Sequence, residues 1–111
     1  MKEINAFVRP HMLNAVLQAL HEHPDFPGVT VSRVRGFGKV AGRDPSQPSG
    51  YGTVEIVKIE CIVEAAHAAD VVQIIRDHAA TGRPGDGKIA VQEVNSVTRI
   101  RTGETGRDAM I

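Results

Sequence analysis

VEIVKIECIV, residues 54–63, is the stretch that decides the fold. Apolar residues recur at every second position, so one face of an extended strand carries Val57, Ile59, Cys61 and Val63. Ile56 breaks this alternation, which indicates a bulge near the start of the strand. The segments on either side of this strand give the order of the remaining elements.

The segment after this strand predicts a helix and then a fourth strand. AAHAADVVQIIRDHAA, residues 65–80, places apolar residues at helical spacing, and the buried positions expected are Val71, Val72, Ile75 and Ala79. Residues 88–97 then predict the last strand. A polar tail follows, at about residues 98–111.

The part of the chain before residues 54–63 begins with a strand and a helix. Residues 3–9 alternate and end at Pro10, which predicts a half-buried strand. An amphipathic helix follows and ends near Pro24, with an apolar stripe made by Leu13, Val16, Leu17 and Leu20. VTVSRVRGFG predicts a second strand from Val29 to about Phe37. Between it and the third strand, residues 38–53 predict a long mobile loop, because residues 38–52 hold four glycines and two prolines.

The resulting order is βαββαβ, which predicts an α+β, ferredoxin-like sandwich formed by one domain, residues 1–111. In this arrangement both helices cover one face of the sheet and leave the other face bare. Several apolar residues are expected on the bare face: Phe7, Val34, Ile62, Ala90 and Val94. A bare face that is partly apolar predicts an oligomer.

Composition excludes several classes of protein. The formal net charge is zero at pH 7, so the excess positive charge of a general nucleic-acid binder is missing. There is no run of 18 apolar residues to insert into a membrane, and the first residues, MKEINAFVRP, contain no apolar signal-peptide core. The one cysteine cannot form an intramolecular disulfide or a multi-cysteine zinc site. A cytoplasmic protein is expected.

TGRPGDGKIAV, residues 81–91, raises the question of a phosphate site. Gly82, Gly87 and Lys88 have the G-x-x-x-x-G-K spacing of a P-loop. However, Ile89 supplies no hydroxyl for Mg²⁺, and here a helix precedes the loop and a strand follows it, which excludes a Walker-type NTPase. Two interpretations remain. The segment is either a helix C-cap at Gly82 followed by a turn, or a cradle of backbone N–H groups for an anion.

Two further motifs point to anions, and none points to catalysis. RIR places Arg99 and Arg101 two residues apart, so an extended segment would aim both guanidiniums to the same side, as suits a polyphosphate; a solvated basic edge is the alternative. GFG, residues 36–38, is by itself only weak evidence for a nucleotide site. The sequence shows no paired carboxylates and no nucleophile motif. The histidines form no recognised set of metal ligands, and surface positions are expected for them.

Five segments in one order resemble the PII signal proteins over the full length of the chain. They are FVRP, GVTVSRVRGFG, VKIE, TGRPGDGKI and VTRIRTGE. The resemblance implies a homotrimer of ferredoxin-like subunits that binds ATP and ADP in competition, in clefts between subunits. It also implies a T-loop, here about residues 38–53, that docks on transporters, enzymes or regulators.

The resemblance implies the following nucleotide contacts. The phosphates are wrapped by Gly85, Asp86, Gly87 and Lys88 and reached by Arg99 and Arg101. The backbone approaches the nucleotide closely at Gly36 and Gly38, with Phe37 between them. Nucleoside and base are contacted by Thr30, Glu60 and Ile62. The ligands expected are ATP and ADP, with Mg²⁺ as a companion of ATP.

The sequence also departs from this family. PII proteins that sense 2-oxoglutarate carry a glutamine and a lysine where this chain has Val40 and Ile56. The uridylylation motif is absent, and Tyr51 stands alone between two glycines in a shorter loop. RPHMLNAVLQAL and PGVTVSRVRGFGK are more similar to a divergent branch encoded beside heavy-metal efflux pumps.

These observations support three hypotheses of function. The leading one is a non-enzymatic, adenine-nucleotide-sensing trimer whose loop regulates a partner, with a membrane transport system as the first choice, and which does not sense 2-oxoglutarate. The alternative is a metal-responsive trimer of similar fold, linked to heavy-metal efflux, that uses its histidines. A slow ATPase is the third. Nucleic acid and direct membrane insertion are not expected for any of them.

Overall fold

The computed structural model describes residues 1–37 and 52–110, and residues 38–51 and 111 lie outside the described part. The elements are β1 (Lys2–Val8), a 3-10 turn (Pro10–Met12), α1 (Leu13–His21), β2 (Thr30–Gly36), β3 (Val54–Val63), α2 (Ala65–Ala79), β4 (Gly87–Glu93) and a second 3-10 turn (Gly106–Met110). The predicted βαββαβ order is confirmed. Most of the predicted loop, including Gly38, Val40 and Tyr51, falls outside the described residues.

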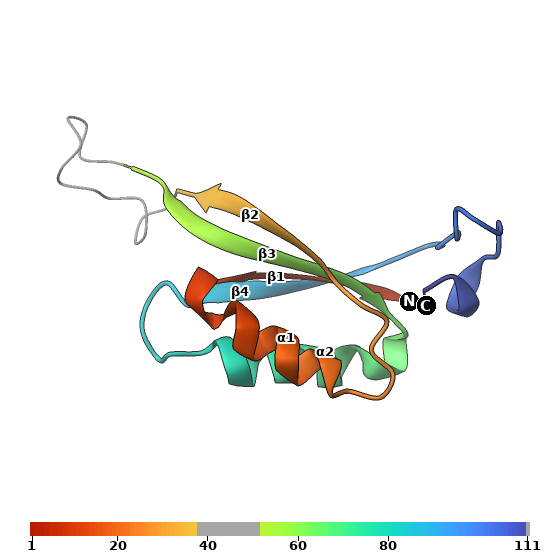
Figure 1. Ribbon diagram of the computed structural model, residues 1–111, viewed down its shortest axis with the longest axis horizontal. Helices are drawn as coiled ribbons and strands as arrows, with labels where there is room; N and C mark the ends of the chain where they lie inside the picture. The colour runs from red at the N-terminus through yellow and green to blue at the C-terminus, as the bar shows by residue number, and fades with distance from the viewer. Residues whose placement is uncertain (38–51, 111) are drawn as a thin grey trace.

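The four strands form one sheet in the order β2-β3-β1-β4, and every neighbouring pair is antiparallel. Figure 1 shows both helices side by side on one face of this sheet, while no helix within residues 1–37 and 52–110 covers the other face. The two central strands are β1 and β3, so both of their edges are paired along the sheet. This is the ferredoxin-like arrangement that the order of elements predicts.

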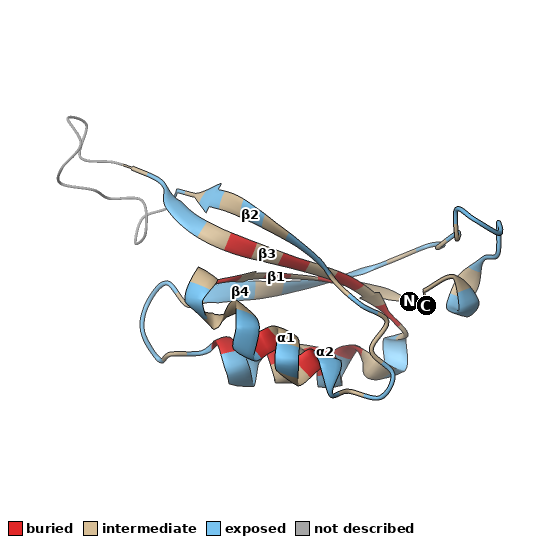
Figure 2. Cartoon of the chain, in the orientation of Figure 1, coloured by how far each residue is buried: buried red, intermediate tan, exposed pale blue. Residues whose placement is uncertain are grey.

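The core lies between the sheet and the helix layer, as the buried stripes in Figure 2 show. Alternate residues of the central strands point into it: Ile4, Ala6, Val8, Val57, Ile59, Cys61 and Val63. The helices contribute Val16, Leu20, Ala68, Val71, Ile75 and Ala79. Val72, predicted to be buried, is only partly buried against this core, and Ala68 takes its place because it lies on the same helical face as Val71 and Ile75.

The bulge predicted at Ile56 is wrong. β2 and β3 pair without interruption from Thr30 opposite Glu60 to Gly36 opposite Val54. Ile56 lies opposite Val34 in this ladder, on the face away from the helices. The alternation along β3 is therefore intact, and Ile56 is an apolar residue of the open face rather than an extra residue in the strand.

Three predicted element ends move inward in the structure. β4 ends at Glu93 instead of residue 97, because Glu93 already pairs with Lys2, the first residue of β1. α1 ends at His21 rather than near Pro24. α2 ends at Ala79, and its C-cap is Ala80 in an extended conformation, so Gly82 is not the cap. Gly82 instead forms the following turn with a φ of 82°.

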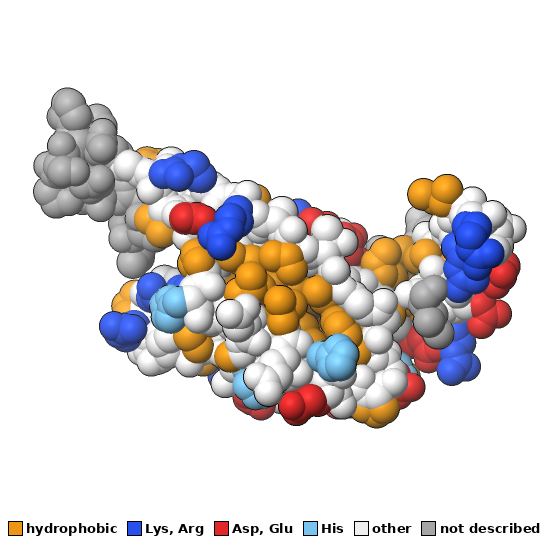
Figure 3. All heavy atoms as spheres, in the orientation of Figure 1, with side chains coloured by type: hydrophobic (Ala, Val, Ile, Leu, Met, Phe, Trp, Pro, Cys, Tyr) orange, Lys and Arg blue, Asp and Glu red, His pale blue; other side chains and the backbone are white. Residues whose placement is uncertain are grey.

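The open face of the sheet carries apolar side chains, as predicted. The strand registers place on it Phe7, Val34, Ile56, Ile62 and Ala90. Val94, also predicted there, lies just beyond the end of β4, where its N–H donates to the carbonyl oxygen of Met1. Hydrophobic side chains also show between α1 and β2 in Figure 3. Val31 of the edge strand β2, which pairs with the buried Ile59, is 39% exposed.

The tail after β4 extends past the end of the sheet (Figure 1). Ile100 in this tail is completely exposed. Within residues 1–37 and 52–110, no helix has the length and apolar character needed to cross a membrane.

Candidate functional site

The 85–88 segment, which supplies four of the residues expected around the phosphates, lies at one end of the sheet. A groove of about 770 Å³ lies there, where the loop before β4 meets the ends of β1 and β2. Its lining includes five of the residues expected to contact the nucleotide: Gly36, Phe37, Gly85, Gly87 and Lys88. Phe7, Val34 and Ile56 form an apolar part of the same lining. The exposed ammonium of Lys88 thus lies beside a groove edged by glycine backbone, which suits an anion.

Asp86 organises the loop that borders this groove. Its carboxylate accepts hydrogen bonds from the backbone N–H groups of Thr81 (2.8 Å) and Gly82 (2.9 Å) and from the Thr81 hydroxyl. Arg9 Nε donates to the same carboxylate at 3.1 Å. These hydrogen bonds, those from Thr81 foremost, hold the pKa of Asp86 well below its ordinary range. The side chain of Asp86 therefore holds the loop together, and its negative charge is taken up within the protein.

Arg9 is a residue of this candidate site that was not expected from the sequence. Besides its bond to Asp86, it donates from Nη2 to the carbonyl oxygen of Pro84 at 2.6 Å, so one side chain fixes two points of the loop. The signal was present in the FVRP segment, where Arg9 stands at the end of the first strand, directly before Pro10. Arg9 lines the groove together with Lys88, and its positive charge is partly neutralised by the ion pair with Asp86.

The fold itself favours glycine at two positions at this end of the sheet, Gly36 and Gly87. Gly87 has a φ of 110°, and a Cβ there would lie 1.7 Å from the carbonyl oxygen of Phe7, its neighbour across the β1–β4 ladder. At Gly36 a Cβ would lie 2.3 Å from Ile56 Cδ1. A side chain at position 87 would collide with the backbone of β1, whereas at position 36 it would displace the flexible end of the Ile56 side chain. These glycines permit both the close strand packing and an approach to the backbone.

The residues expected around nucleoside and base lie at the opposite end of the sheet. Thr30 pairs with Glu60 in the β2–β3 ladder, and Ile62 lies on the same open face. All three line a second groove, of about 400 Å³, with the loop before β2 and the last 3-10 turn. Cys61 borders this groove too, but it is 5% exposed, and burial together with the nearby Glu3 carboxylate raises the pKa of its thiol to about 11.

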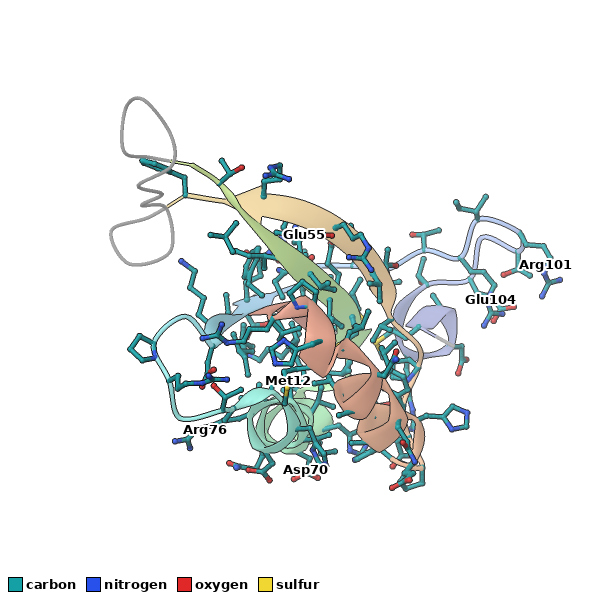
Figure 4. The ribbon with its side chains drawn as sticks, turned by 60° about the vertical axis from the view of Figure 1, so that its left-hand side comes forward. Met12, Glu55, Asp70, Arg76, Arg101 and Glu104 are labelled. Atoms are coloured by element: carbon teal, nitrogen blue, oxygen red, sulfur yellow. The ribbon has the colours of Figure 1, made fainter. Side chains whose placement is uncertain are left out.

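Arg99 and Arg101 lie in the tail beyond this second groove, but not in an extended segment. Gly103 N–H donates to Arg99 C=O at 2.8 Å, and Arg99 N–H donates to Glu104 C=O at 2.8 Å, so the chain reverses between them. In a strand, residues two apart point to the same side, but in a turn they do not. The prediction that both guanidiniums point to one side is therefore wrong. Arg99 is held 3.4 Å from a Glu104 carboxylate oxygen. Arg101 points away from the sheet at the outer end of the tail (Figure 4).

The expected contacts thus form two separate groups within one protomer. Thr30 and Gly36 are the first and last residues of β2, six steps apart, which corresponds to about 20 Å. Gly36, Phe37 and the 85–88 segment belong to one end, whereas Thr30, Glu60, Ile62 and the two arginines belong to the other. Gly38 lies outside the described residues. A single protomer does not bring the two groups together.

Comparison with known proteins identifies the family. Residues 1–104 match the family described as Nitrogen regulatory protein P-II. The chain is 42% identical to the Nitrogen regulatory protein P-II of Rhizobium meliloti, with 99% of this chain and all of that protein aligned. It is 41% identical to the protein of the same description from Synechocystis, again over 99% of this chain and all of the relative.

A solved structure gives the same result. The crystal structure of Arabidopsis thaliana PII bound to citrate is similar with a TM-score of 0.80 and 38% sequence identity, covering 98% of this chain and 88% of that one. The chain belongs to the PII family of nitrogen regulatory proteins. It is accordingly a regulatory signal-transduction protein and not an enzyme.

Proposed function

We propose that this protein binds ATP and ADP at sites formed between the protomers of a homotrimer, and that its 38–53 loop passes the nucleotide state to a partner protein. Membership of a family that binds adenine nucleotides, forms trimers and regulates partner proteins supports the proposal. A membrane transport system is the partner we favour. The observation that carries the proposal is the separation of the expected contacts into two groups at opposite ends of one sheet.

Each group is half of a nucleotide site. Lys88 and the glycine backbone at positions 85 and 87 offer a cation and N–H groups, which suit phosphates. Thr30, Glu60 and Ile62 offer a hydroxyl, a carboxylate and an apolar side chain, which suit a nucleoside and its base. Arg101, at the outer end of the tail, extends from this second half toward a neighbouring protomer and adds positive charge for the phosphates, while Arg99 is held beside Glu104.

Two neighbouring protomers would join one half of each kind. The open sheet face supplies the reason for association, since its apolar residues include Phe7, Val34 and Ile56, which lead directly into the first groove. A cyclic trimer has heterologous contacts, in which one end of a protomer meets the opposite end of the next. The arrangement then gives three equivalent sites, each with Lys88 from one protomer and Arg101 from its neighbour.

We also propose that 2-oxoglutarate is not a ligand. Mg²⁺ requires oxygen ligands, and Val40 offers none where nitrogen-sensing relatives have a glutamine. Ile56 offers no positive charge for a distal carboxylate. Its side chain is instead packed over Gly36, in the lining of the first groove.

Mixed trimers test the assignment of the two halves. Lys88→Ala and Arg101→Ala should each weaken ATP binding about ten- to a hundred-fold as homotrimers, because each removes a charge-assisted contact. When the two variants are unfolded together in equal amounts and refolded, about a quarter of all sites should recover the affinity of the unmodified protein, because such a site draws Lys88 from one variant and Arg101 from the other. Titration calorimetry with ATP counts these sites.

Two results would contradict the proposal. If the mixed trimers bind no better than the separate variants, each site lies within one protomer and the assignment of halves is wrong. If both single variants keep the affinity of the unmodified protein, neither residue contacts the nucleotide. Arg76→Ala is the matched control, because Arg76 is an exposed arginine on α2, outside both grooves (Figure 4).

A further inference from the structure

Two of the five histidines meet between the end of α1 and the start of α2, although surface positions were expected for all of them. His23 lies just after α1 and His67 in the first turn of α2. Their rings contact edge to face, with centroids 5.7 Å apart. The packing of α1 against α2 creates this pair, and the 43 residues between the two histidines hide it from any motif search.

Carboxylates surround the pair. His23 Nε2 lies 3.9 Å from a carboxylate oxygen of Asp70, one helical turn after His67. His67 Nε2 lies 3.6 Å from Asp25 and 3.8 Å from Glu64, measured to one carboxylate oxygen of each. Three of these residues, His23, His67 and Asp70, place one ligand atom each within 4.8 Å of one another.

We propose that His23, His67 and Asp70 form a binding site for a divalent transition metal ion of the Zn²⁺ class. Imidazole nitrogen with one carboxylate oxygen is a donor set that Zn²⁺, Cu²⁺ and Ni²⁺ accept, whereas Mg²⁺ and Ca²⁺ prefer oxygen alone. Asp25 or Glu64 provides the fourth ligand, since both already lie within 4 Å of His67. This site goes beyond the nucleotide function and shares none of its proposed residues.

The geometry requires a small closure. Ligand atoms around a tetrahedral Zn²⁺ with bonds of about 2.0–2.1 Å lie about 3.4 Å apart. The present separations reach 4.8 Å, so side chains must move inward by about 1 Å. The side chain of Asp70 is 71% exposed and free to rotate, whereas that of His23 is 12% exposed and provides the fixed point.

His23 is already oriented by the backbone. Its Nδ1 accepts a hydrogen bond from the N–H of Asp25 at 3.2 Å, which directs the opposite ring nitrogen, Nε2, toward Asp70. Metal binding through Nε2 moves the ring proton to Nδ1 and releases this bond. The loop that starts at Pro24 is then the segment that responds, and it leads to the residues before β2.

The site also has an opening and a link to the tail. A pocket of about 170 Å³ beside it is lined by Asp25, Glu64 and His67 together with Arg107 and Met110. Arg107 forms an ion pair with Glu64, which joins the last 3-10 turn to the start of α2. The pocket gives water or an incoming ion access to His67 without unfolding of either helix.

The test is a zinc titration of the full chain without an affinity tag. Calorimetry of metal-free protein with ZnCl₂ should show one site per chain, and Co²⁺ in its place should give the intense visible absorption of a four-coordinate nitrogen and oxygen site. His67→Gln and His23→Gln should each lower the Zn²⁺ affinity about tenfold or more, because each removes a ligand. His21→Gln is the matched control, since His21 is an exposed histidine at the end of α1 and should leave the affinity unchanged.

Circular dichroism checks that each variant is folded, and an ATP titration of the same samples separates this site from the nucleotide site. If the metal-free protein binds no Zn²⁺ at micromolar concentrations, the cluster is a set of ion pairs that joins the two helices and the proposal is wrong. It is equally wrong if His23→Gln and His67→Gln keep full affinity, or if His21→Gln loses as much as they do.

Discussion

Arg9 Nε lies 3.1 Å from a carboxylate oxygen of Asp86, and this contact joins the end of β1 to the loop that precedes β4. Both side chains are about three-quarters buried. Arg9 also binds the carbonyl oxygen of Pro84, while Asp86 binds the backbone of Thr81 and Gly82. The loop that borders the proposed phosphate half is thus held in shape before any ligand arrives, which lowers the entropy lost on binding.

Asp86→Asn should destabilise the protein and make its free energy of unfolding depend less on pH in the acid range. The pKa of Asp86 is lower in the folded state than its ordinary value of 3.8, so the folded state favours the carboxylate. The resulting stability is complete above that ordinary value and is lost as the pH falls below it. Urea unfolding at pH 7 and pH 3, at one protein concentration, should show a smaller difference between the two pH values for the variant. Asp108→Asn is the control, and equal pH responses of Asp86→Asn and the unmodified protein would contradict the prediction.

Gly87→Ala should destabilise the protein more than Gly82→Ala. Both glycines have a positive φ, which costs a residue with a side chain about 1–2 kcal/mol. At Gly82 a Cβ would meet nothing within 4 Å, whereas at Gly87 it would lie 1.7 Å from the Phe7 carbonyl oxygen. Relief of that clash requires β1 and β4 to separate, so we expect a total loss of about 3 kcal/mol or more. Denaturant unfolding of the two variants measures the difference, and equal losses would show that the strand contact has no cost.

Phe7→Glu should convert a trimer into a folded monomer. Phe7 lies on the open face with the Lys58 ammonium 5.9 Å from its ring centroid, so a glutamate there gains a local partner in the monomer. At an interface the same carboxylate would lose its water. Light scattering should give about three times 11.9 kDa for the unmodified protein and a single chain mass for the variant. Gln18→Glu, which adds the same charge on the outer side of α1, should stay trimeric. A single chain mass for the unmodified protein at micromolar concentration would contradict the prediction.

2-Oxoglutarate should not bind at micromolar concentrations, even with saturating Mg-ATP. Val40 offers no oxygen to Mg²⁺ and Ile56 offers no charge to a carboxylate. Titration calorimetry of 2-oxoglutarate into the protein with saturating Mg-ATP measures this affinity. Val40→Gln together with Ile56→Lys restores both side chains of the nitrogen-sensing relatives and should raise the affinity. Micromolar binding by the unmodified protein would mean that other residues supply these contacts.

Sequence alone determined the order of elements and the faces of the central strands. The period of two in residues 3–9 and 54–63, and the helical period in residues 65–80, are local properties of the backbone, so they can be recognised without knowledge of the partners. The resemblance carried by five short segments identified the PII family for the same reason, because each segment is continuous in the chain.

Tertiary structure decided what depends on residues far apart in the chain. β4 ends at Glu93 because its partner β1 begins opposite it at Lys2, and there is no bulge at Ile56 because β3 pairs with β2 in continuous register. His23 meets His67 because two helices pack, and Arg9 meets Asp86 because β1 and β4 pair. The turn that carries Arg101 is closed by bonds between Arg99 and residues 103 and 104. Each of these contacts is fixed by strand register, helix packing or chain reversal, and periodicity in the sequence reports on none of them.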